Sequence, residues 1–106
     1  MANSYKVVGQ ANPGTAVTDL YTVGASTEFV GTLFIAETGG TAQTARVSVA
    51  SGGSADAIGQ AVLRDFSIPA NDALQLPGFA LAATDKVRVY ASTTDVVFTL
   101  MGVEIT

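Results

Sequence analysis

The sequence predicts an all-β protein, an antiparallel β-sandwich or jelly roll of about seven or eight strands. Three observations lead to this prediction. Apolar and polar residues alternate with a period of two over several segments, which is the pattern of a strand with one buried face. Gly, Pro, Asn and Asp residues separate these segments at the spacing expected of a sandwich. Valine and threonine, whose branched side chains suit a pleated sheet, are frequent.

The whole chain is assigned to one domain. Its 106 residues contain no linker, charge block or internal repeat, and this length suits a single core. Residues 1–106 are therefore expected to form one β-sandwich domain, with residues 1–17 as an N-terminal arm or an edge strand.

Residues 28–37 form the most apolar of the predicted strands. One face carries Phe29, Gly31, Leu33 and Ile35, and the other carries Val30, Thr32, Phe34 and Ala36. Because both faces are substantially apolar, this segment is predicted to be a central strand.

Residues 44–50 alternate more cleanly. Ala45, Val47 and Val49 are predicted to face the core, while Thr44, Arg46 and Ser48 point outward. A Gly39-Gly40 turn precedes this strand. We therefore expect residues 28–37 and 44–50 to pair as a hairpin.

The C-terminal third repeats the alternation. Residues 86–91 are predicted to bury Val87, Val89 and Ala91, and residues 96–105 form a long strand that is apolar on both faces. Shorter strands are expected over residues 5–9, 18–23, 61–68 and 73–81, the last with a break at Pro77-Gly78.

Residues 54–63 have two interpretations. Ile58, Ala61 and Val62 lie at helical spacing behind a capping Ser54. Gly59, and the strand-like Phe66 and Ile68 that follow, favour a loop and then a strand.

The composition excludes several kinds of chemistry. The chain has no cysteine and no histidine, which removes disulfides, thiol nucleophiles, imidazole bases and the usual zinc or haem ligands. Its net charge of −4 lacks the basic footprint of a protein that binds nucleic acid or an anionic membrane. No signal-peptide core or membrane-length apolar run is present. We therefore expect a protein that is made in the cytoplasm and is kept or assembled there, with no enzymatic activity, nucleic-acid partner or membrane partner.

The carboxylates do not form a recognisable site. Asp56, Asp65, Asp72, Asp85 and Asp95 occur singly, whereas a calcium site needs several converging oxygens. They are interpreted as turn-capping residues, and no cofactor or metal is expected.

Five residues are the candidates for an interface with another chain. Tyrosines can anchor a partner, and arginines favour interface contacts. Tyr90 is the best exposed tyrosine candidate, because it lies on the polar face of its strand beside Arg88. The full candidate set is Tyr90, Arg88, Arg46, Tyr5 and Tyr21, with Arg64 as a further outward arginine.

The apolar second faces of the two long strands predict an oligomer. Apolar residues lie on opposite faces of each strand, as do Phe29, Val30, Phe34 and Ile35 on one and Phe98, Met101 and Val103 on the other. Only one face of each strand can point into a two-sheet core, so the other face must be covered by loops or by a neighbouring chain. Exposed apolar patches of this kind mark interfaces. The chain is therefore expected to act as a homo-oligomer.

Much of the chain resembles small β-rich virion proteins of tailed bacteriophages. The resemblance lies in the segments 68–72, 79–92 and 97–105, together with 5–10 and 19–23. These motifs describe strands and turns, and the family carries no catalytic residues to transfer. The resemblance implies a structural virion protein described as capsid-associated or tail-fibre-associated.

The leading functional hypothesis is a capsid decoration or cement protein. It would bind the major capsid protein on the outer shell of a tailed phage and stabilise the shell by burial at many copies. The alternatives are a tail-fibre or baseplate module, and a carbohydrate-binding module that recognises host glycans. The expected location is the virion, assembled in the host cytoplasm, with the capsid surface ahead of the tail. The resemblance also favours a homotrimer, because capsid shells offer threefold positions.

Overall fold

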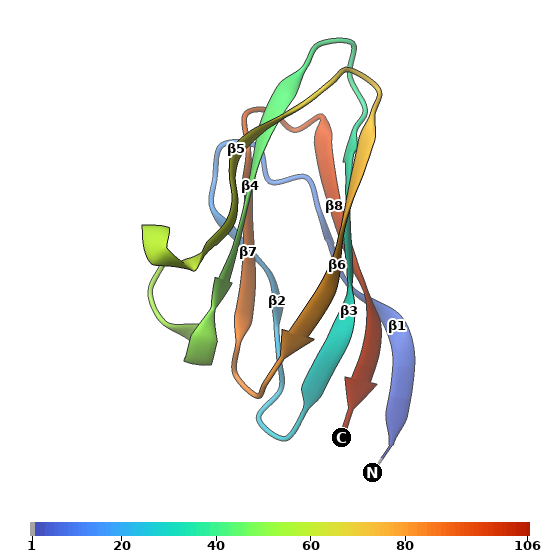
Figure 1. The fold of residues 1–106 in the computed structure, drawn as a ribbon, viewed down its shortest axis with the longest axis vertical. Helices are drawn as coiled ribbons and strands as arrows, with labels where there is room; N and C mark the ends of the chain where they lie inside the picture. The colour runs from blue at the N-terminus through green and yellow to red at the C-terminus, as the bar shows by residue number, and fades with distance from the viewer. Residues whose placement is uncertain (1) are drawn as a thin grey trace.

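Two four-stranded antiparallel sheets face each other in a computed structural model, which describes residues 2–106 (Figure 1). The molecule extends 45 × 27 × 18 Å. Its eight strands confirm the predicted all-β fold. They are β1 (Asn3–Ala11), β2 (Thr18–Thr22), β3 (Glu28–Glu37), β4 (Gln43–Ala50), β5 (Ala61–Ile68), β6 (Ala73–Leu81), β7 (Lys86–Ala91) and β8 (Val96–Ile105).

The strand order is that of a jelly roll. One sheet has the order β1-β8-β3-β6 and the other the order β2-β7-β4-β5. Consecutive strands therefore alternate between the two sheets, except for β4 and β5, which pair with each other. Eight antiparallel strands arranged in two sheets in this way form a jelly roll.

The predicted hairpin between residues 28–37 and 44–50 is wrong. Strand β3 pairs with β8 and β6, while β4 lies in the opposite sheet. Instead of closing a tight turn, residues 38–42 cross between the sheets. The buried carboxylate of Glu37 holds this crossing, because it accepts hydrogen bonds from the backbone N–H groups of Gly39 at 2.7 Å and Asn71 at 3.1 Å.

The alternation identified the core correctly. Four central strands, β3 and β8 in one sheet and β4 and β7 in the other, supply most of the buried side chains. Those with no more than 1% exposure on these strands are Phe29, Leu33, Ile35, Ala45, Val47, Ala50, Val87, Val89, Ala91, Val96, Phe98 and Leu100. Val49, predicted to face the core, is only partly buried against it.

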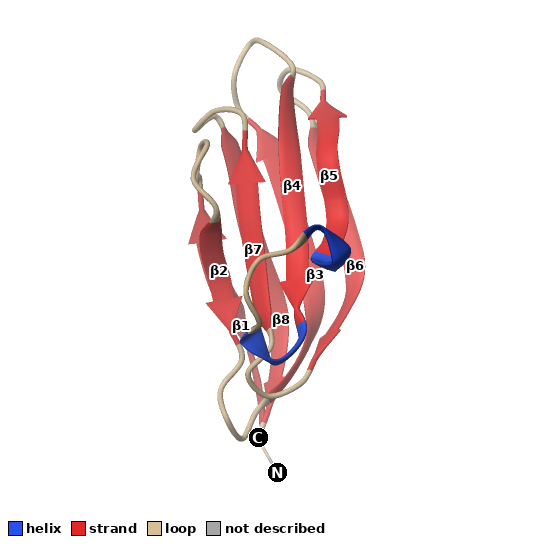
Figure 2. Cartoon of the chain, turned by 90° about the vertical axis from the view of Figure 1, so that its left-hand side faces the viewer, coloured by secondary structure: helices blue, strands red, loops and turns tan. Residues whose placement is uncertain are grey.

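Residues 51–60 form a loop and not a regular helix. It contains two single turns of 3₁₀ helix, Ser51–Gly53 and Ile58–Gln60, before β5 begins. Of the two interpretations, the loop followed by a strand is confirmed. The loop lies over the outer face of the β2-β7-β4-β5 sheet (Figure 2).

The predicted break in the 73–81 strand is a β-bulge. Pro77 and Gly78 lie between residues paired with Gly31 and Leu33 on β3, so two residues oppose one. Gly78 has a φ of +87°, a left-handed conformation that glycine adopts without strain. The bulge lies on β6, which is an edge strand.

A pair of glycines lets β3 and β8 carry a large aromatic ring between the sheets. Gly31 and Gly102 lie directly opposite each other. A Cβ atom on Gly31 would lie 2.3 Å from the carbonyl oxygen of Met101 and 2.5 Å from the ring of Phe29. The missing side chain of Gly31 therefore provides the space that the Phe29 ring occupies, and that of Gly102 allows the backbones of β3 and β8 to approach closely.

A polar cluster closes the same end of the sandwich. The hydroxyl of Tyr21, on β2, donates a hydrogen bond to Glu104 on β8, and Lys6 Nζ on β1 lies 2.6 Å from the other Glu104 oxygen. The ring of Tyr21 packs edge-on against Phe29 at 5.2 Å. Lys6 and the Tyr21 hydroxyl lower the pKa of Glu104, while burial and the carboxylate raise the pKa of Tyr21. The cluster joins the two sheets.

We predict that Gly31→Ala destabilises the fold. The added methyl group meets backbone and a buried ring, and such overpacking costs about 1–3 kcal/mol. The melting temperature should fall by about 4–8 °C for each kcal/mol lost. Gly40→Ala is the matched control, because nothing lies within 4 Å of its Cβ position. Equal melting temperatures for the two variants would contradict the close approach.

The Glu104 cluster predicts a loss of stability in acid. Since the folded-state pKa of Glu104 lies below its usual value, its contribution is fully present above that usual value and disappears as the pH falls through the folded-state pKa. Glu104→Gln should flatten the acid side of the stability curve, measured by denaturant unfolding at a series of pH values. Glu28→Gln, an exposed glutamate on β3, should leave the curve unchanged, and a similar flattening there would refute the assignment.

Candidate functional site

The two outer faces of the sandwich differ in chemistry. Directly paired residues on neighbouring antiparallel strands point to the same side of a sheet, so the register assigns each side chain to a face. The outer side of the β1-β8-β3-β6 sheet carries almost no charge, and we call it the apolar face. The outer side of the other sheet carries most of the basic residues, and we call it the charged face.

Rows of uncharged side chains run across the apolar face. One row contains Tyr5, Val103, Val30 and Ala80, and a neighbouring row contains Val7, Met101 and Thr32. Tyr5 is 76% exposed, Val7 and Val30 are each 50% exposed, and Met101 is 37% exposed. The register places one charged residue on this face, Glu28, at the end of β3 opposite Ile105. The face therefore offers an extended apolar contact surface.

Sequence reasoning identified this surface only in part. The second faces of the two long strands pointed to Val30 and Met101, which are exposed here. Of the five candidate interface residues, however, Tyr5 is the one on the apolar face. The missed residue is Val7, on the same strand as Tyr5, and its alternation with Tyr5 was the available signal.

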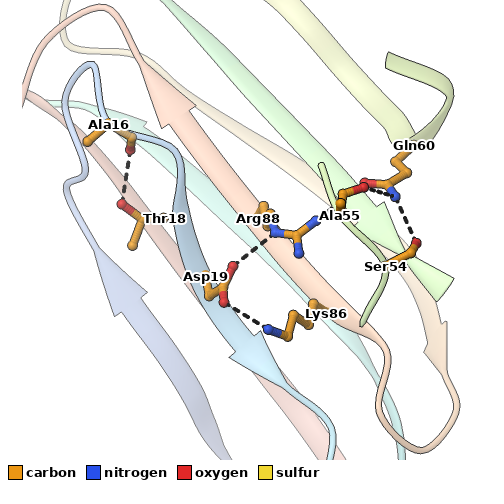
Figure 3. Close-up of polar contacts among 8 residues, drawn as sticks. All are labelled: Ala16, Thr18, Asp19, Ser54, Ala55, Gln60, Lys86 and Arg88. Carbon is orange, nitrogen blue, oxygen red and sulfur yellow. Dashed lines mark hydrogen bonds and ion pairs between the residues drawn. The ribbon is translucent and has the colours of Figure 1, made fainter. Parts of the chain in front are cut away.

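On the charged face, carboxylates hold the basic side chains in place. Asp19 lies between Lys86 at 3.2 Å and Arg88 at 3.0 Å (Figure 3). Hydrogen bonding to Lys86 lowers the pKa of Asp19, and Arg88 acts in the same direction. Arg88 is only 9% exposed, so its guanidinium has a fixed position.

Arg46 is held in a similar way. It donates two hydrogen bonds to Asp65, from Nε at 2.6 Å and from Nη2 at 3.3 Å. Its guanidinium carbon lies 4.3 Å from the centre of the Tyr90 ring, within the range of a cation–π contact. The hydrogen bonds from Arg46 lower the pKa of Asp65.

Three of the five candidate residues come together on the charged face. Arg46 pairs directly with Tyr90 across β4 and β7, and Arg88 is opposite Ser48 in the same pair of strands. All three line one small cavity beneath the 51–60 loop, together with Arg64. Tyr21 is separate, because its hydroxyl is bound to Glu104 between the sheets. Contact between these candidate residues and another chain remains a prediction.

Two of the five aspartates hold turns together as predicted, whereas the prediction is wrong for Asp65, which lies within β5 and binds Arg46. Asp85 accepts hydrogen bonds from the backbone N–H groups of Gly52 and Ala82, at 2.8 and 2.9 Å. Asp72 accepts one from Ala73 at 2.8 Å. Within residues 2–106, no group of three or more acidic residues is placed to hold a metal ion. In the same residues, no helix is long and apolar enough to cross a membrane.

Comparisons with known proteins identify relatives of the fold. No family model matches the sequence, and no curated protein matches it either. Among solved structures, a chain of the infectious bursal disease virus Gx strain superposes with a TM-score of 0.52 and 13% identity. A chain of the T13 particle of the same virus gives 0.51 and 12%.

These matches cover only part of each viral chain. Each covers 98% of this chain but only 32% and 28% of the respective viral chain. A pentameric capsid protein from metagenomic phage sequences aligns with 15% identity over 96% of this chain and 60% of that chain, but its TM-score of 0.30 supports no argument. The likeness shows the fold alone: this chain has a β-sandwich similar to part of a chain of the infectious bursal disease virus particle.

Proposed function

We propose that this protein is a structural component of a virus particle, a decoration or cement protein on the outer capsid surface of a tailed phage. It binds the major capsid protein and stabilises the shell through many identical contacts. The observation that carries the proposal is the apolar face, where Tyr5, Val7, Val30 and Met101 are exposed on one sheet.

The size of the apolar face is adequate for a protein contact. Four strands about 4.8 Å apart, with about ten residues of about 3.3 Å each, span about 600 Å². A standard interface buries about 800 Å² on each partner. One such contact is weak to moderate, but repetition over a shell adds the contacts of many copies. The fold shared with viral capsid chains supports the same proposal.

The other functions have less support from the geometry. A carbohydrate-binding module would use Tyr5, which is well exposed, but sugar recognition also needs precisely placed polar groups. Around Tyr5 the surface is formed by Val7, Met101, Gly102 and Val103, with Lys6 as the charged neighbour. A tail-fibre or baseplate module would use the same apolar face. Mass spectrometry of purified particles separates the two virion locations, since hundreds of copies indicate decoration and about a dozen indicate the tail.

The apolar face predicts that Val30→Lys weakens attachment to particles. A lysine at the centre of the contact must lose its hydration on binding, and a buried unpaired charge is strongly unfavourable. Co-sedimentation with particles stripped of this protein should show binding weakened at least about tenfold, which is about 1.4 kcal/mol. Ser67→Lys is the matched control, because Ser67 is exposed on β5 of the opposite sheet. Full binding by Val30→Lys would refute the proposed contact.

We also expect a homotrimer on the particle, with the threefold positions of a shell as its sites. Light scattering of the purified protein, repeated on protein released from particles, measures the state. A trimer in either setting supports the expectation, and a monomer in both contradicts it.

A further inference from the structure

The cavity on the charged face gathers three of the chain's five basic residues. Its walls include Arg46, Arg64 and Arg88, with Tyr90 beside them. Ala57, from the overlying 51–60 loop, also lines it. Asp56 is the acidic residue in the lining. In a chain with a net charge of −4, this concentration of guanidinium groups is unusual.

Two of the arginines are positioned in advance but retain unused donors. Arg88 uses Nε for Asp19, at 3.0 Å, and Nη1 for Gln60, at 3.4 Å. Arg46 uses Nε and Nη2 for Asp65. Arg88 Nη2 and Arg46 Nη1 make no hydrogen bond within residues 2–106. Neither nitrogen is fully buried. Guanidinium groups fixed in this way lose little freedom when they bind an anion.

A β-bulge places the third arginine. Between the pairs Ala45–Phe66 and Val47–Leu63, the single residue Arg46 faces both Arg64 and Asp65. Bulges of this kind redirect side chains. Asp65 has a φ of +49°, a left-handed conformation that is uncommon outside glycine and that often marks functional positions.

The charge of Arg64 is not neutralised by a direct partner. Its side chain forms no ion pair within the described chain, whereas Arg46 and Arg88 each have one. Three carboxylates, Asp19, Asp56 and Asp65, face four basic groups on this side, Arg46, Arg64, Lys86 and Arg88. Among the residues that line the cavity, Arg64 is thus the basic residue without an ion-pair partner.

The size of the cavity limits what can enter. Its volume is about 30 Å³, and one water needs about 10–15 Å³ on the same measure. The space suits two oxygen atoms, such as those of a carboxylate head. Arginine donors match the planar geometry of a carboxylate with paired hydrogen bonds.

We propose that this cavity is a binding site for a carboxylate, namely an aspartate or glutamate side chain presented by a neighbouring protein chain. The incoming oxygens accept hydrogen bonds from Arg64 and from the unused donors of Arg46 and Arg88. Tyr90 keeps Arg46 in place through its ring. The site lies on the face opposite the proposed shell contact, so the inference does not depend on the proposed function.

The test is an NMR titration of the purified protein that follows the side-chain Nε–Hε signals of the arginines. The probes are acetate and N-acetylglutamate α-amide, with N-acetylglutamine α-amide as the neutral comparison. We expect saturable shifts of Arg46, Arg64 and Arg88 with the two carboxylates and none with the neutral amide. No shift at concentrations on the order of 100 mM would overturn the proposal.

Variants separate the site from general electrostatics. Arg64→Gln should weaken binding about tenfold or more, because it removes a charge-assisted hydrogen bond. Lys6→Gln makes the same change in net charge on the other sheet, and it should leave affinity within about twofold. Arg64 is exposed, so its replacement should leave the fold intact, and the backbone spectrum verifies this. Equal weakening by both variants would refute a localised site.

Two further probes test the class of ligand. Inorganic phosphate is tetrahedral, and N-acetylneuraminic acid carries its carboxylate directly on a sugar ring. Both should bind more weakly than N-acetylglutamate α-amide if the cavity accepts only a carboxylate head on a flexible stem. Tighter binding of either one would overturn the assignment to a protein side chain.

Discussion

The packing of four central strands against one another is the constraint on which the rest of the molecule depends. Strands β3 and β8 bury Phe29, Leu33, Ile35, Phe98 and Leu100 against the inner residues of β4 and β7. Because side chains alternate along a strand, fixing the inner set also fixes the outer set. The apolar face and the charged face are thus direct consequences of the same core, and burial is the main source of its stability.

Alternation predicted the faces of the strands but not their partners. The buried sets of β3, β7 and β8 follow from a period of two, and so does the exposure of Val30 and Met101. The partner of β3 does not follow, because alternation is the same whichever strand lies alongside. The crossing held by Glu37 depends on backbone groups at Gly39 and Asn71, which are distant in sequence from one another. The predicted hairpin was wrong because alternation does not specify which strand pairs with β3.

The candidate site was predictable residue by residue but not as an arrangement. Arg46, Arg88 and Tyr90 were each expected to point outward, and they meet because β4 and β7, which are not consecutive, are neighbours. Tyr21 shows the opposite case. A register shift between Asp19 and Tyr21 moves Tyr21 to the side of Val87, so it lies between the sheets while Asp19 stays outside. No local pattern in the sequence reports such a bulge.

The bulge at Pro77 and Gly78 has a consequence for the behaviour of the protein at high concentration. It lies on β6, an edge strand of the sheet that carries the apolar face. Proline offers no N–H group, and the bulge bends the strand away from regular pairing. Another chain cannot easily extend the sheet along this edge, which is the route to amyloid-like fibres. Along its β6 edge, the sheet that carries the exposed apolar surface is therefore favoured to associate face to face and not edge to edge.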